Sequence, residues 1–257
     1  MSEDAILNES AYRLKARAEM DAWLAKVSMG PSPLGQTARA LQKRMNKLIP
    51  ERVQAAVTSV IEQMTRAIIV GADLTTAKPL LDAPLSEREA RVRARIAAHR
   101  AAGAAEGGIA GAGGFLMNMA EFPVLIATKI RLLFEIAALY GHDGGDLDER
   151  LYILSIFQLA FSSPEHRLDV LAQMRDWDAH APERPRTPDA VDWRRFQQEY
   201  RDYIDLAKLA QLIPVVGAPI GAIVNYRLLN RLGEAAIGAY RLRWFNNSAE
   251  RPGKPVH

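Results

Sequence analysis

The turn HDGGDLDER at residues 142–150 holds the densest group of side chains that could do chemistry. His142, Asp143 and Asp146 are of the types that bind cations or transfer protons. However, the aspartate spacing of a calcium-binding EF-hand loop is missing. A glycine that caps the end of one helix and an acidic residue that caps the start of the next would also explain this sequence. We therefore interpret the turn as helix caps and predict no metal, with these three residues as weak candidates.

Two polar residues interrupt long uncharged stretches. Glu121 is the only charged residue within residues 107–128, and Asn225 lies within the uncharged residues 209–226. A buried carboxylate or amide without a partner costs about 1–3 kcal/mol. Backbone groups freed by nearby prolines could be such partners. We expect both side chains to point into the protein. Two roles are compatible with this position: a structural role, in which the polar groups are hydrogen-bonded, or a ligand-binding or catalytic role.

Glycine and proline shape the same two stretches. Pro123 interrupts the first, and Pro214 the second, so each is expected to form a Gly/Pro-broken helical hairpin. Gly217 and Gly221 have the G-x-x-x-G spacing that lets another helix approach closely. Close packing in a soluble bundle and a hairpin that contacts lipid both explain this pattern.

The composition and the absent motifs of the chain exclude several classes of function. The chain has no cysteine, which excludes disulfides and thiolate chemistry, and no H-E-x-x-H, G-x-S-x-G or Walker A motif. With 33 basic and 30 acidic residues the net charge is only +3. This charge is much smaller than the positive charge that is typical of a nucleic-acid-binding domain. We expect no cofactor and no nucleic-acid partner, and the absent motifs favour a protein that is not an enzyme.

Apolar residues recur at helical spacing almost throughout, so the predicted fold class is all-α, a helical bundle. A first helix is expected from Asp4 to Val27. Ser86 with Glu89 has the capping-box spacing that begins a basic helix, and Gly141 stands where a helix C-cap belongs. The uncharged run at residues 151–164 is too short to cross a membrane and favours a core helix.

The last helix has an expected apolar face and an expected polar face. Tyr226, Leu229, Tyr240 and Trp244 are among the residues of the apolar face. Arg241 falls on the opposite side, with the other charged residues. We therefore expect the Arg241 side chain to lie on the polar face of this helix.

Three segments taken in order resemble the EcsC family of bacterial proteins, over roughly residues 50–245. They are AEFPVLIATKIRLLFEIAALYGHD, DERLYILSIFQLAF and IPVVGAPIGAIVNYRLLNRLGEAAIGAYRLRWF. The family signature is carried here by Ile213, Pro214, Gly217, Ala218, Gly221, Ala222 and Asn225. Glu121 stands where the family more often has Asp, and His142 where it more often has an aromatic residue. The family is named from a gene beside an ABC-transporter operon, and its molecular activity is not established.

The domain organisation follows from composition and from this resemblance. Residues 1–35 are expected to form an N-terminal helical arm and residues 36–247 an EcsC-like helical domain. Within it, the prolines of residues 180–190 predict an exposed connector. Residues 248–257 are expected to be a flexible tail. Since the N-terminus lacks a signal-peptide pattern, we expect a cytoplasmic protein, peripheral to the inner face of the cell membrane.

These features lead to one functional hypothesis and two alternatives. The first is a membrane-associated accessory protein that contacts the cytoplasmic membrane or a transporter through its apolar Gly/Pro-rich segments. Its contact candidates are Glu121, Pro123, Pro214, Gly217, Gly221 and Asn225. One alternative is a hydrolase or lipid-modifying enzyme with an acidic residue in a buried pocket. The other is a soluble helical scaffold, and the sequence predicts no oligomeric state.

Overall fold

The structure is a computed structural model, and it describes most of the chain. The described residues are 3–29, 59, 62–63, 65–70, 77–110, 114–162, 166–190 and 218–249. For residues 3, 103–110, 114–126, 218–225 and 248–249 only the backbone is described. The contact candidates Pro214 and Gly217 lie outside the described residues. Their role as membrane or ligand contacts, and the close helix contact expected at Gly217, therefore stay predictions.

The fold is all-α, as the sequence predicts, and no strand occurs among the described residues. The longer helices are α1 (Glu3–Ser28), α4 (Leu85–Ala110), α5 (Gly114–Tyr140), α6 (Leu147–Phe161), α7 (Arg167–Arg175) and α10 (Ala218–Ala249). Two short 3-10 turns, η1 (Ala181–Glu183) and η2 (Pro188–Ala190), follow α7. Residues 180–190 include no buried residue.

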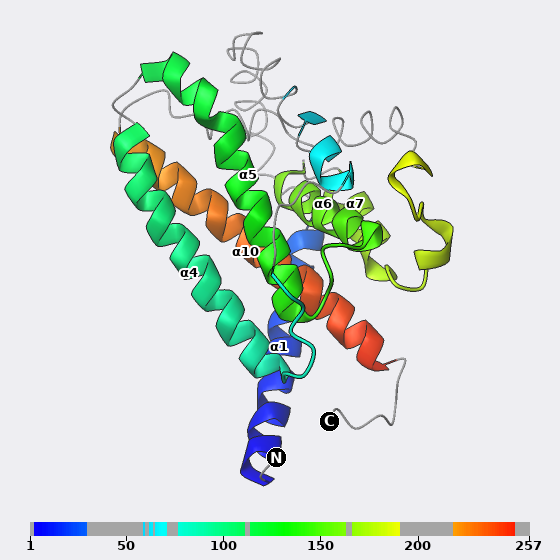
Figure 1. Ribbon diagram of the computed structural model, residues 1–257. Coiled ribbons are helices and arrows are strands. Elements are labelled where there is room, and N and C mark those ends of the chain that lie inside the picture. Colours follow the sequence, from blue (N-terminus) through cyan, green and yellow to red (C-terminus); the bar gives the residue numbers. More distant parts are fainter. Residues whose placement is uncertain are drawn as a thin grey trace.

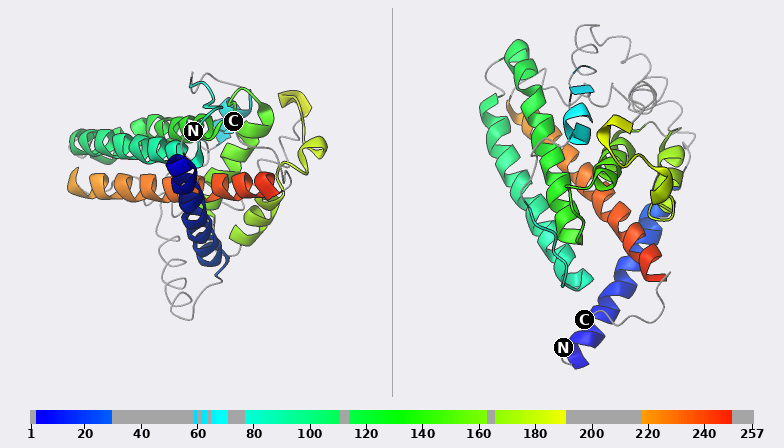
Figure 2. Two further views of the ribbon diagram at one scale, coloured as in Figure 1. Left: turned by 90° about the horizontal axis from the view of Figure 1, so that it is seen from below. Right: turned by 45° about the vertical axis from the view of Figure 1, so that its right-hand side comes forward.

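Helix α10 is the centre of the bundle. It contacts α1, α4, α5, α6 and α7. α4 and α5 run antiparallel to each other (Figure 1). α4 lies beside both halves of α10, from Tyr226 to Arg241, and α5 reaches the second half at Tyr240. α1, α6 and α7 also pack around this second half. The two further views keep α4 and α10 side by side and show α1 crossing α10 (Figure 2). Most side chains on the second half of α10 are therefore buried against other helices.

Helix α6 supplies much of the core. Its residues 151–154, 156–157 and 159–161 are apolar and buried, which confirms the prediction of a core helix from a run that is hydrophobic all round. Phe157 and Phe161 pack on each other with ring centroids 4.7 Å apart. Since the chain buries this helix on every side, other elements must cover all of its faces.

Helix α5 ends in a glycine cap, as predicted. Gly141 has φ +94°, a conformation that L side chains rarely adopt. Its N–H donates to the carbonyl of Ala138, and the N–H of His142 donates to the carbonyl of Ala137. This pair of bonds is the Schellman motif, which satisfies the last carbonyls of the helix. The cap fixes the direction in which the chain leaves α5.

The start of α4 is near the predicted position, but the predicted capping box is wrong. Glu9 of α1 accepts hydrogen bonds from the backbone N–H groups of Leu85 and Ser86 and from the Ser86 hydroxyl. Ser86 lies inside the helix, and the Glu89 carboxylate is buried and accepts hydrogen bonds from Arg241. A carboxylate from another helix satisfies the free donors here, an arrangement that local spacing could not predict.

The expected break at Pro123 is also wrong, because α5 continues through Pro123 as one helix. A proline inside a helix removes one backbone hydrogen bond, and the bonds on both sides can keep the helix continuous at a cost of about 3 kcal/mol. None of the helices in the described part of the chain is both long and apolar enough to cross a membrane.

Candidate functional site

A buried carboxylate, Glu89 of α4, joins four helices. It is fully buried and accepts hydrogen bonds from the Nε and Nη2 of Arg241 on α10, both at 2.7 Å. Tyr12 of α1 donates to it at 2.7 Å and Tyr140 of α5 at 3.2 Å. Arg93, one turn along α4, adds a further bond at 2.9 Å. The helices α1, α4, α5 and α10 therefore share this one carboxylate near the start of α4.

A second buried carboxylate, Glu149 of α6, lies beside the same part of α10. Tyr240 donates its hydroxyl to Glu149 at 2.5 Å, and the Nη1 of Arg243 donates at 2.6 Å. Arg243 also donates to both carboxylate oxygens of Asp178, at 2.6 to 2.9 Å. Its guanidinium lies over the ring of Tyr152, 4.8 Å from the centroid. Through its bonds to Glu149 and Asp178, Arg243 therefore links α6 and the segment after α7 to α10.

The two carboxylates differ in pKa. Burial raises the pKa of Glu149, and its bonds to Arg243 and Tyr240 only partly offset that effect. Burial also acts on Glu89, but the bonds from Arg241 and Tyr12 and the charge of Arg93 hold its pKa below the ordinary value. Glu89 has two arginines, whereas Glu149 shares a single arginine with Asp178. The number of arginine partners explains the difference.

The turn that the sequence analysis singled out is built around His142. Its ring stacks on Tyr240 with centroids 5.4 Å apart, and its Nδ1 lies 3.4 Å from Glu149. Burial, followed by the charge of Arg243, lowers the pKa of His142 to about 3. The imidazole is therefore neutral at pH 7, and its contact with Glu149 is not an ion pair.

The weak metal candidates of this turn do not form a metal site. Asp143 is exposed and accepts the backbone N–H of Gly145 at 2.8 Å, while Asp146 is exposed at the N-cap of α6. No group of three histidines or acids that could hold a metal occurs among the residues with described side chains. The cap interpretation is confirmed at Gly141 only, because the Asp146 side chain makes no capping bond.

Arg88 is a further buried charge, and it binds carbonyl groups instead of acids. It donates to the backbone oxygens of Leu80, Leu81 and Ala83 and, at 3.2 Å, to that of Leu139 near the end of α5. A cation is favoured at a helix C-terminus, where the carbonyl dipoles are negative. Arg88 therefore fixes the segment before α4 against the end of α5.

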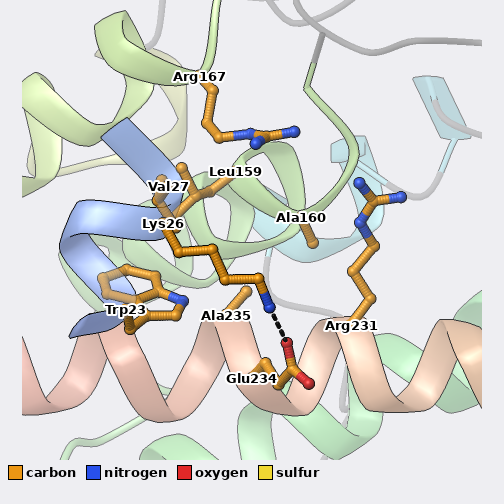
Figure 3. A pocket seen from close by; sticks show the side chains of 9 residues that line it. All are labelled: Trp23, Lys26, Val27, Leu159, Ala160, Arg167, Arg231, Glu234 and Ala235. Carbon is orange, nitrogen blue, oxygen red and sulfur yellow. Dashed lines mark ion pairs between the residues drawn. The ribbon is translucent and has the colours of Figure 1, made fainter. Parts of the chain in front are cut away.

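A surface pocket of about 180 Å³ lies where α1, α6, α7 and α10 meet (Figure 3). Leu159, Ala160 and Ala235 are buried apolar residues of its wall. The charged residues of its lining are Lys26, Arg167, Arg231 and Glu234. Nζ of Lys26 lies 3.5 Å from the Glu234 carboxylate. The pocket is separate from the buried carboxylates and offers space to a small ligand.

The uncharged parts of three helices gather at one end of the bundle. The second part of α4, the first half of α5 and the start of α10 lie together there in both views (Figures 1 and 2). Among residues 103–110, 114–126 and 218–225 the charged residues are Glu106 and Glu121. We name these three segments the uncharged end. The structure thus brings the start of α10 to the end of α4 and the first half of α5, from which it is far apart in sequence.

Four of the predicted contact candidates belong to the uncharged end. The first half of α5 contains Glu121 and Pro123, and the start of α10 contains Gly221 and Asn225. Only their backbone is described, so the expectation that the Glu121 and Asn225 side chains point into the protein stays a prediction.

The prediction for Arg241 is wrong. It was expected on the polar face, yet it is buried against Glu89. Sequence analysis also missed Glu89, Glu149 and Arg243 as buried residues. The available signal was the AYRLRWF segment, in which two arginines stand within an apolar run, a pattern typical of charges with buried partners.

Comparison with known proteins gives a consistent result. The profile of the EcsC protein family matches residues 14–245. The chain is 38% identical to Protein EcsC of Bacillus subtilis (strain 168) over 213 residues, which cover 82% of this chain and 87% of that protein. It is 28% identical to the Uncharacterized protein YdbA of the same organism over 138 residues, 54% of this chain and 51% of that protein. No solved structure matches the chain.

Proposed function

The chain belongs to the EcsC protein family, and we propose that it is a membrane-associated accessory protein whose uncharged end contacts an anionic lipid surface. The observation that carries the proposal is the gathering at one end of the bundle of three helical segments whose charged residues are Glu106 and Glu121 alone (Figure 1). Such segments lower their free energy when they leave water for the boundary between lipid headgroups and acyl chains.

The length of the uncharged end suits shallow insertion. Its longest segment, residues 114–126 of α5, is about 20 Å long as a helix. A span of the bilayer needs about 20 residues, whereas interfacial helices enter only about 5–10 Å. The absence of a membrane-crossing helix from the described residues is compatible with this mode of contact.

Basic residues follow the uncharged segments on two of the three helices. Arg131 of α5 and Arg227 of α10 are exposed. Basic side chains at this position would lie at the level of the lipid phosphates when the end inserts. Each such residue contributes about 1 kcal/mol of attraction to an anionic surface. The overall charge of +3 is small, so the attraction would be local.

Vesicle flotation of the full-length protein tests the proposal. We expect co-flotation with vesicles that contain phosphatidylglycerol, weaker but still measurable binding at high salt, and little binding to pure phosphatidylcholine. Protein-free vesicles also separate a lipid contact from a contact with a transporter. If the protein binds none of the vesicles at low salt but sediments with cell membranes, the result would contradict the lipid contact and indicate a protein partner.

A further inference from the structure

We propose that Arg100 and Tyr226 form the contact site for a lipid phosphate at the edge of the uncharged end. This inference rests on the proposed membrane contact and adds to it the residues that hold the headgroup. Arg100 of α4 comes three residues before the uncharged end, and Tyr226 of α10 directly follows it. The two side chains meet, because the guanidinium carbon of Arg100 lies over the Tyr226 ring, 5.3 Å from its centroid.

Arg100 differs from the arginines that precede it on α4. Arg91, Arg93 and Arg95 each have a guanidinium nitrogen 2.5 to 3.5 Å from a glutamate oxygen. Arg100 has no such partner among the residues with described side chains, and its Nε is buried without a hydrogen-bond acceptor there. A buried donor without an acceptor is unfavourable. The side chain is long and only partly buried, so rotation of its outer bonds can present Nε to an oxygen of a ligand.

The lengths of two uncharged segments put this pair at the level of lipid headgroups. Residues 103–110 of α4 and 218–225 of α10 each form about 12 Å of helix. Because interfacial helices enter only about 5–10 Å, side chains just beyond these segments lie near the phosphates. Tyr226 is 50% exposed. An exposed tyrosine suits this level, since its ring packs on apolar groups while its hydroxyl stays in water.

The chemistry of the pair favours a phosphate over a diffuse negative charge. A guanidinium group can donate two parallel hydrogen bonds to phosphate oxygens, whereas an ammonium group acts as a point charge. The Tyr226 ring covers one face of the Arg100 guanidinium and leaves its edge for such bonds. Arg100 should therefore bind the phosphate by geometry as well as by charge, and lysine should not replace it.

Flotation of charge-preserving variants with phosphatidylcholine vesicles that contain phosphatidylglycerol tests the proposal. Arg100→Lys should partition about five-fold more weakly than the wild type, because one of two hydrogen bonds to the phosphate is lost. Arg227→Lys is the matched control, an exposed arginine beside Tyr226, and should partition within about two-fold of the wild type because its charge is kept.

Two substitutions of Tyr226 provide an independent measurement. Tyr226→Ala removes the ring that holds the guanidinium and should weaken partitioning about as much as Arg100→Lys does. Tyr226→Phe keeps the ring and should bind like the wild type. Urea unfolding checks that each variant is folded, and Arg100→Lys should keep the wild-type midpoint because it breaks no ion pair between described side chains.

The results separate this inference from the proposed function. Wild-type partitioning by Arg100→Lys or by Tyr226→Ala would overturn the phosphate contact and leave the membrane contact in place. Equal losses in Arg100→Lys and Arg227→Lys would also overturn it, since they would show no special role for the stacked arginine. A wild-type protein that floats with no vesicles at low salt would contradict the membrane contact itself, and this inference with it.

Discussion

Tyr140 and Tyr240 stack with their ring centroids 4.9 Å apart, and each donates its hydroxyl to a different buried glutamate. Tyr140 reaches Glu89, and Tyr240 reaches Glu149. The stacked rings therefore join two buried carboxylate–arginine clusters into one network across α4, α5, α6 and α10. All the acids of this network have donors, so the arrangement is suited to holding helices together.

The two tyrosines should differ in their contribution to stability. Tyr240→Phe keeps the stack but leaves Glu149 with a single donor residue, Arg243, and should lower the free energy of unfolding by about 1–3 kcal/mol. Tyr140→Phe should cost less, because Glu89 keeps Tyr12 and two arginines. Urea unfolding measures both, with the half-exposed Tyr226→Phe as control. A larger effect for Tyr140→Phe would contradict this order.

Removal of the arginine of a buried pair should be more costly. Arg241→Gln should lose about 3 kcal/mol or more, because Glu89 remains buried with less charge compensation. Arg227→Gln, an exposed arginine on the same helix, should stay within about 0.5 kcal/mol of the wild type. The double variant Glu89→Leu/Arg241→Leu should be no less stable than Arg241→Gln. Equal unfolding midpoints for Arg241→Gln and Arg227→Gln would show that the pair does not stabilise the fold.

Stability should fall in mild acid because of His142. Its pKa is lowered from 6.5 to about 3 by burial and then by Arg243. Below pH 6.5 the unfolded chain takes up a proton that the folded protein does not, so the free energy of unfolding falls from pH 6.5 toward pH 3. At pH 5 this loss is about 2 kcal/mol.

The variant His142→Phe isolates this effect, since it keeps a ring against Tyr240 but cannot titrate. The raised pKa of Glu149 acts in the opposite direction as the pH falls toward 4.5, and it is present in both proteins. Urea unfolding between pH 5 and pH 7 should give a flatter profile for His142→Phe. The exposed His180→Phe should keep the wild-type slope. Parallel profiles for all three proteins would refute the assignment to His142.

The cap at Gly141 should not tolerate a side chain. A Cβ at Gly141 would lie 2.8 Å from the Nη1 of Arg88, and alanine would also be strained at φ +94°. Gly141→Ala should lower the free energy of unfolding by about 1–3 kcal/mol. Gly145→Ala, in the same turn, should cost less, because its φ is not positive and the nearest atoms belong to the flexible Asp143 side chain. Similar thermal midpoints for the two variants would contradict this account.

Local patterns in the sequence predicted most of the fold. The structure confirms three features that neighbouring residues in the sequence determine. They are the limits of α1, the end of α5 at Gly141 and the burial of α6. The buried network could not be predicted in this way. Arg241 and Glu89 are 152 residues apart, so no periodic pattern relates them. The true cap of α4, Glu9, likewise comes from another helix.

The candidate site was predicted in part. The sequence indicated the stretches 107–128 and 209–226, and the structure places the end of α4, the first half of α5 and the start of α10, which contain parts of them, at one end of the bundle. The pocket between α1, α6, α7 and α10 had no sequence signal, since its charged lining residues Lys26, Arg167 and Arg231 lie on three helices and each resembles a solvated surface charge.

The central claim is that the uncharged end enters the lipid headgroup region, and site-directed spin labelling tests it most directly. The chain has no cysteine, so a single Leu116→Cys labels the first turn of α5, and Leu14→Cys labels an exposed site in the half of α1 at the opposite end. With phosphatidylglycerol vesicles, the label at position 116 should become more accessible to oxygen and less accessible to an aqueous nickel complex, while the label at position 14 stays unchanged. No change at position 116 on protein that floats with the vesicles would contradict the claim.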